Sequence, residues 1–150
     1  MYALAGSKEK AAKAKDLGAL EVIDYSSNPD WELEVFKITR GKGVDVVVDN
    51  VGAKTLPKSL AAVRRGGRIV TVGNTSGFAV QLDNRQFFVK QVSLIGSTMG
   101  SRQDFLEALS FIIDQHIKVP IDCVAPLSQG IAQIKRMEEG KHFGKIVLKP

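Results

Sequence analysis

The chain has 150 residues, with 21 Lys or Arg against 16 Asp or Glu, and a formal net charge of +5. Such a length suits one domain, and 44% hydrophobic with 25% charged residues is ordinary for a globular protein. The basic residues are spread along the chain without a nucleic-acid-binding motif, so we expect no nucleic-acid partner. No apolar run approaches the roughly 20 residues of a membrane span, so we expect no membrane partner. The single Cys123 excludes an internal disulfide and favours a reducing, cytoplasmic location.

Strand-like and helix-like segments alternate from the first residues onward. Helix ends are marked by polar caps such as Ser7 and Ser101 and by glycines such as Gly18. In chain order we expect a strand at 2–5, a helix from Ser7 to Leu17, a strand at 21–24, a helix from Asp30 to Arg40, a strand from Val44, a helix at 54–63, a strand at 68–73, a helix at 84–90, a strand at 92–96, a helix from Ser101, a helix at 128–139 and a strand at 145–148.

This alternation predicts an α/β fold with a parallel sheet and helices on both faces, joined by right-handed crossovers. The three consecutive valines Val46–Val48 predict a strand that is buried on both faces, as parallel sheets usually require.

Small or polar residues follow five of the predicted strands. Open parallel sheets bind ligands beyond the carboxyl ends of their strands, so five such ends in register favour a ligand cleft. The alternative is that they are only turn residues of a structural sheet. The residues are Gly6 and Ser7, Tyr25, Asn50–Gly52, Gly73–Thr75 and Gly96–Thr98.

The end of the first predicted strand indicates which ligand to expect. Its sequence is typical of the second strand of a dinucleotide-binding sheet. Sheets that bind NAD usually place a carboxylate at the end of that second strand, which accepts a hydrogen bond from the ribose 2′-hydroxyl. This chain has Ser7, Lys8 and Lys10 instead, and hydroxyl, ammonium and helix N-terminus all suit a 2′-phosphate. The pattern favours NADP over NAD. The alternative is that Ser7 is only a helix cap and that the lysines are only solvated.

Other chemistries find little support. Cys123, His116 and His142 lack metal-ligand spacing, so we expect no metal site. Asp45 and Asp49 share one strand, but Asp45 lies near its start, so we assign the pair no acid–base role. We predict no catalytic residue in this chain.

Several phrases taken together resemble one family. AGSKEKAAKAKDLGALEVIDY, GKGVDVVVDNVG, RRGGRIVTVGNTSG, LIGSTMGSRQDF and GKIVLKP occur in the order found in the medium-chain dehydrogenase/reductase superfamily. The nearest branch contains quinone oxidoreductases and zinc-type alcohol dehydrogenase-like proteins. The resemblance implies a Rossmann-like fold and hydride transfer between NADPH and quinones, enones, aldehydes or alcohols.

The resemblance also implies roles for individual residues. Ser7 and Lys10 would bracket the 2′-phosphate of NADP, and Tyr25 would lie beside the adenosine. Asn50, Val51 and Gly52 would line the ribose, whereas Gly73 and Asn74 would approach the nicotinamide half. Ser97 and Thr98 lie on a segment that in such proteins often joins two subunits through edge strands.

Residues 1–150 match a truncated NADP-binding domain with the C-terminal tail of the family. By comparison with the family, we expect residues 1–150 to lack the substrate domain and the first βα unit with its glycine-rich turn. In the strand order 3-2-1-4-5-6 this leaves a slot between the strands at 2–5 and 44–49. Three arrangements are open: direct pairing of the two strands, a strand of another chain in the slot, or a different packing of the later strands. We favour a homodimer through strand edges.

Two functional hypotheses follow. The chain is the cofactor-binding portion of an NADPH-dependent oxidoreductase, with weak or absent NADP binding and weak or no activity alone. Alternatively, it is a non-catalytic module that kept the fold and binds itself or a partner.

Overall fold

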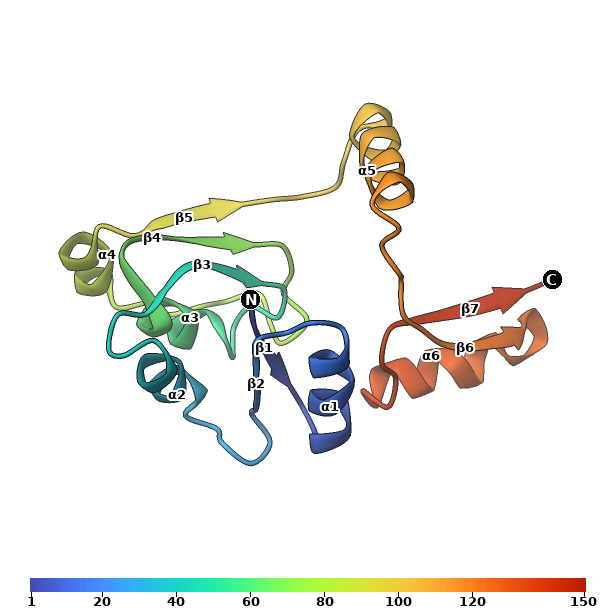
Figure 1. Ribbon diagram of the computed structural model, residues 1–150, viewed down its shortest axis with the longest axis horizontal. Coiled ribbons are helices and arrows are strands. Elements are labelled where there is room, and N and C mark those ends of the chain that lie inside the picture. Colours follow the sequence, from blue (N-terminus) through green and yellow to red (C-terminus); the bar gives the residue numbers. More distant parts are fainter. The chain divides into compact units, whose positions relative to one another are not determined.

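Strands and helices alternate as expected over residues 1–150, all of which the computed structural model describes (Figure 1). No helix is both long enough and apolar enough to cross a bilayer. The elements are β1 (Tyr2–Ala5), α1 (Lys8–Asp16), β2 (Glu21–Asp24), α2 (Trp31–Ile38), β3 (Val44–Asp49), α3 (Leu56–Ala62), β4 (Val63–Thr71), α4 (Asn84–Lys90), β5 (Ser93–Gly96), α5 (Arg102–Asp114), β6 (Ile121–Pro126), a 3₁₀ turn (Leu127–Gln129), α6 (Gly130–Glu138) and β7 (Lys145–Lys149).

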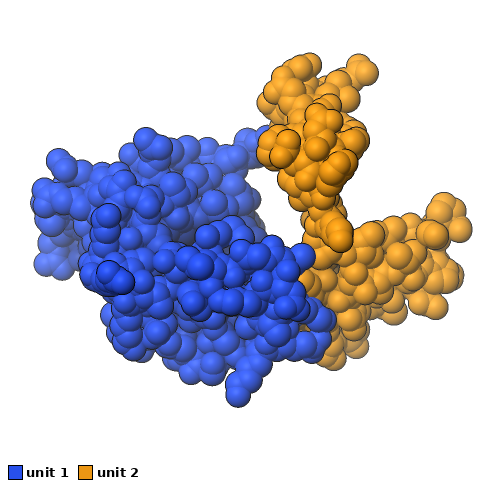
Figure 2. Space-filling view, viewed as in Figure 1, with its two compact units in different colours: residues 1–99 blue, residues 100–150 orange.

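The chain divides into two units, residues 1–99 and residues 100–150 (Figure 2). The second unit contains α5, α6 and the parallel pair β6–β7. Strand β6 was not predicted from the sequence, because a proline precedes it, another ends it and Asp122 interrupts its apolar pattern. Asp122 is itself satisfied, since it accepts hydrogen bonds from the Arg136 guanidinium at 2.9 and 3.0 Å and from the Phe143 amide at 2.9 Å.

All strand pairs of the first unit are parallel. Strand β1 pairs with β2, and β3, β4 and β5 form a separate three-stranded sheet in that order. Strands β1 and β3 do not pair with each other, so the alternative of direct pairing between them is wrong for this structure. Strand β5 stays beside β4, so the later strands keep the expected order as well.

A helical layer links the two sheets of the first unit. Trp31 and Val35 of α2 pack with Ile23 of β2 and Ala62 of α3 in one buried cluster. At its border Lys58 of α3 places its ammonium 3.2 Å from Asp30 Oδ1 and 3.1 Å from Glu32 Oε2. Side-chain burial and ion pairs, rather than a continuous hydrogen-bond ladder, therefore connect β2 to the larger sheet.

A second cluster fills the space between α3 and the larger sheet. It contains Leu56, Leu60, Val63 and Ile69, with Val47 packed against it. Lys90 caps the C-terminal end of α3, because its ammonium donates to the carbonyls of Leu60, Ala61 and Val63 at 2.9, 2.6 and 3.1 Å. Its burial lowers the pKa of Lys90 below the ordinary 10.5. A lysine thus satisfies the helix-end carbonyls that the backbone leaves without partners.

The prediction that β3 is buried on both faces is wrong. Val47 faces the cluster beneath α3, whereas the side chains on the opposite face, Val46 and Val48, are 51% and 69% exposed. Side chains alternate between the faces of a strand, so one face of β3 is packed and the other is open.

The packing predicts that two side-chain truncations to alanine lower the free energy of unfolding by very different amounts. Leu60 is 1% exposed, so Leu60→Ala should lower the free energy of unfolding by about 2–5 kcal/mol through lost burial and a cavity. Val48→Ala, on the open face of β3, should cost well under about 1 kcal/mol. Urea unfolding followed by circular dichroism measures both, and equal losses would contradict this placement of the core.

Candidate functional site

The first group of candidate residues lies where β1 and β2 end. Ser7 caps α1, because its Oγ accepts a hydrogen bond from the Lys10 amide at 3.2 Å. The hydroxyl proton of Ser7 is not consumed by this bond and can be donated to a ligand. Glu9, the acidic residue of the first turn, is paired with Lys13 at 2.7 Å, which offsets its charge.

Tyr25 belongs to the same group. Its amide donates to the Ala5 carbonyl at 3.0 Å, and its ring lies against Gly6. A Cβ at Gly6 would come within 2.6 Å of the Tyr25 hydroxyl oxygen, so glycine is what allows this close approach. The structure therefore brings Ser7, Lys10 and Tyr25 to one end of the smaller sheet.

The second group surrounds the buried carboxylate of Asp49, which is 4% exposed at the end of β3. Its Oδ1 accepts from the amides of Val51 and Gly52, both at 3.0 Å, and from the Thr55 hydroxyl at 2.8 Å. Its Oδ2 accepts from the Ser59 hydroxyl at 2.7 Å. Burial by itself raises the pKa of Asp49, but the hydrogen bonds together outweigh it and hold the pKa below the ordinary 3.8.

The Asp49 contacts shape the loop that carries Asn50, Val51 and Gly52. Gly52 has a φ of +90°, a conformation that L side chains rarely adopt. A Cβ at Gly52 would lie 2.9 Å from the Asn74 Cα, and one at Gly73 would lie 2.6 Å from the Asn50 carbonyl oxygen. The loops after β3 and β4 therefore touch backbone to backbone, and the structure brings all five of these predicted residues together.

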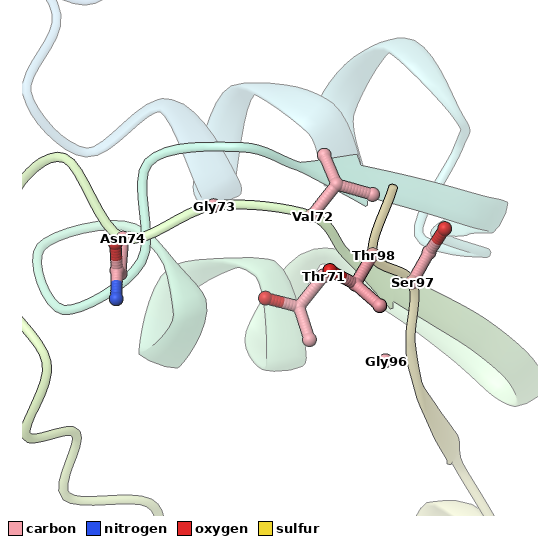
Figure 3. Close-up of a pocket in the computed structure, with 7 residues that line it drawn as sticks. All are labelled: Thr71, Val72, Gly73, Asn74, Gly96, Ser97 and Thr98. Atoms are coloured by element: carbon pink, nitrogen blue, oxygen red, sulfur yellow. The ribbon is translucent and has the colours of Figure 1, made fainter. Parts of the chain in front are cut away.

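An open hollow of about 500 Å³ lies at the carboxyl ends of β4 and β5 (Figure 3). Gly73 and Asn74 form part of its wall, so two predicted residues line it. In the view of Figure 3 the side chains of Val72 and Ser97 point upward, and those of Thr71 and Asn74 point downward. The lining residues are Thr71, Val72, Gly73, Asn74, Gly96, Ser97 and Thr98.

Sequence reasoning missed three contributors to the site. Thr71 was taken only as a strand residue, and Asp49 was considered only for acid–base chemistry. Ser76, whose hydroxyl donates to the Val51 carbonyl at 2.8 Å, was not singled out. With both carboxylate oxygens occupied by donors, Asp49 instead holds a loop. The available signal was a carboxylate at a strand end, three residues before a glycine, where it can accept from loop amides.

The residues of this chain do not fit a zinc site. No group of three or more His, Cys, Asp or Glu side chains is placed to hold a metal ion. Cys123 has Gln133 Oε1 3.4 Å from its Sγ. We therefore derive no chemical step through a metal in this chain.

The lowered pKa of Asp49 predicts a dependence of stability on pH. A carboxyl whose folded pKa is depressed stabilises the fold fully above its ordinary value, here 3.8, and that stability is lost as the pH falls through the folded-state pKa. Asp49→Asn should therefore unfold at lower urea concentration than the wild type between pH 5 and 7, and the difference should shrink below pH 3.8. A difference that stays constant into that acid range, or is absent at neutral pH, would contradict this role.

Known proteins resemble this chain in sequence and in fold. The profile of a family described as zinc-binding dehydrogenase matches residues 1–114. The zinc-type alcohol dehydrogenase-like protein YogA of Leptosphaeria maculans is 33% identical in an alignment that covers 99% of this chain and 43% of that protein.

Solved structures of dehydrogenases also match this chain. An NAD-dependent alcohol dehydrogenase matches with a TM-score of 0.90 and 38% identity over 99% of this chain and 43% of its own. A quinone oxidoreductase of Pseudomonas syringae matches with a TM-score of 0.85 and 31% identity over 99% of this chain and 48% of its own. The chain thus spans less than half the length of these relatives. It belongs to the zinc-binding dehydrogenase family and corresponds to the C-terminal nucleotide-binding part of medium-chain dehydrogenases/reductases.

Proposed function

We propose that residues 1–150 form the cofactor-binding portion of an NADPH-dependent oxidoreductase. The observation that carries the proposal is the edge at the strand ends, where Gly52 and Gly73 let the loops after β3 and β4 meet backbone to backbone. Gly73 and Asn74 there form part of the wall of the open hollow. The bound cofactor supplies hydride for a quinone, enone, aldehyde or alcohol-type substrate. The chain itself would bind and orient the cofactor. Asn50, Val51 and Gly52 would line the ribose, and Gly73 and Asn74 would approach the nicotinamide half. We place no proton-transfer residue in it.

Selectivity for NADP over NAD is proposed to reside at the start of α1. No carboxylate ends β1, and the Ser7 hydroxyl, the α1 N-terminus and the Lys10 charge suit a phosphate dianion. Tyr25, which lies over Gly6, would flank the adenosine. One structural neighbour is titled an NAD-dependent alcohol dehydrogenase, so NADH is the competing ligand that an experiment has to include.

Reversal of one charge tests this selectivity. Lys10→Glu should weaken NADPH binding about tenfold or more, since it replaces attraction for the 2′-phosphate by repulsion, and it should leave NADH affinity nearly unchanged. Lys42→Glu, the same charge change at the amino end of β3, is the matched control. Calorimetric titration with both nucleotides measures the ratio. Equal losses for NADPH and NADH, or no loss, would show that the phosphate is not bound here.

A second candidate, a self-associating module, is favoured by the outer edge of β5. This strand pairs only with β4, and its Leu94 and Ile95 are 42% and 44% exposed. An open apolar edge strand is a template for pairing with another chain. We propose that the chain forms a homodimer through this edge, whether or not it binds a nucleotide.

A charge placed on the edge tests the dimer. Ile95→Lys should shift the protein toward monomer, because a buried ammonium at a paired edge is costly to desolvate. Ile131→Lys, on an 86% exposed side chain of α6, is the control for added charge. Light scattering over a concentration series reads the mass. A wild-type monomer, or a dimer that Ile95→Lys leaves intact, would exclude this interface.

A further inference from the structure

Ser76 makes hydrogen bonds between the loops after β3 and β4. The Ser76 amide donates to the Val51 carbonyl at 2.9 Å, and the Ser76 hydroxyl donates to the same oxygen at 2.8 Å. The hydroxyl oxygen also accepts a hydrogen bond from the Lys54 amide at 2.9 Å. The Ser76 side chain, from the loop after β4, therefore binds Val51 and Lys54, two residues of the segment after β3.

Asp49 holds the same loop from its base. Its carboxylate accepts from the Val51 and Gly52 amides, so Val51 is bound through its amide by Asp49 and through its carbonyl by Ser76. The four partners of Asp49 are uncharged, and the carboxylate is buried. The carboxylate is therefore not available to contact a ligand itself, and the groups that it positions are the amides of the loop.

We propose that Asp49 and Ser76 are positioning residues that lock the loops 50–52 and 73–76 into one binding edge before a nucleotide arrives. The proposal rests on the function proposed above, that this edge binds a nicotinamide nucleotide. A loop that is already ordered does not have to lose conformational freedom on binding, so affinity is retained. The single donor proton of Ser76 is used on Val51, so the serine acts through the loop rather than on the ligand.

The chain offers a closely matched control. Thr39 also donates one hydroxyl hydrogen bond to a carbonyl, that of Val35 at 2.6 Å, and accepts one from an amide, that of Gly43 at 2.9 Å. It lies between α2 and the start of β3, at the opposite end of the strand from the loops. Thr39→Val and Ser76→Ala therefore remove equivalent hydrogen bonds, but only the second removes them from the binding edge.

The test compares nucleotide affinity, thermal stability and amide hydrogen exchange. We expect Ser76→Ala to lower NADPH and NADH affinity alike by about tenfold, which is 1.4 kcal/mol, and to speed exchange at Lys54 and Ser76. Asp49→Ala should act similarly at Val51 and Gly52, and Asp49→Asn should recover part of the affinity, because its amide oxygen still accepts from both amides. Thr39→Val should lose comparable stability without losing affinity.

The outcomes separate this inference from the function beneath it. If the wild-type chain binds neither nucleotide, the proposed function fails and this inference with it. If the wild type binds but Ser76→Ala and Asp49→Ala bind equally well, only this inference is overturned. It is also overturned if Thr39→Val loses as much affinity as Ser76→Ala, because the effect would then report general stability.

Discussion

The geometry of the site depends on a charged group that is buried without an opposite charge. Burying an ionised carboxylate is costly unless hydrogen bonds replace its water, and Asp49 receives four of them from two amides and two hydroxyls. Those donors come from the loop after β3 and from Thr55 and Ser59 at the start of α3. Satisfying the carboxylate therefore fixes the loop and the helix entry at the same time.

Packing within the first unit holds α3, and with it the Asp49 loop, in place. Leu56 and Leu60 of α3 anchor the helix on Val63 and Ile69, and Lys90 closes its far end. The same helix contributes Ala62 to the cluster that reaches β2 through α2. Because β1 and β3 share no hydrogen bonds, this helical layer is what links the Ser7–Tyr25 group to the larger sheet. A change in the packing of α3 would thus alter the positions of both groups of candidate residues.

Local sequence patterns were sufficient to predict most of the helices and strands. The helix at Asn84–Lys90, the Ser7 cap and the strands β1 and β2 were predicted correctly, because caps, glycines and apolar periodicity act over a few residues. Burial is a property of the whole assembly, so the exposure of Val46 and Val48 could not be read from three consecutive valines. The hydrogen bond from the Ser76 hydroxyl to the Val51 carbonyl spans 25 residues, and no local sequence pattern predicts it. Candidate positions at strand ends were therefore predictable, whereas the residues that hold them in place were not.

The most direct test of the account is to map where a nucleotide binds on residues 1–150. We would follow the backbone amide signals of the labelled 16.3 kDa protein by NMR while adding NADPH to saturation, with NADH in parallel. The account predicts shifts concentrated at Ser7 and Lys10, at Val51 and Gly52, and at Gly73, with the first pair responding more to NADPH. No shifts at saturating nucleotide, or shifts clustered away from the carboxyl ends of β1 to β4, would contradict it.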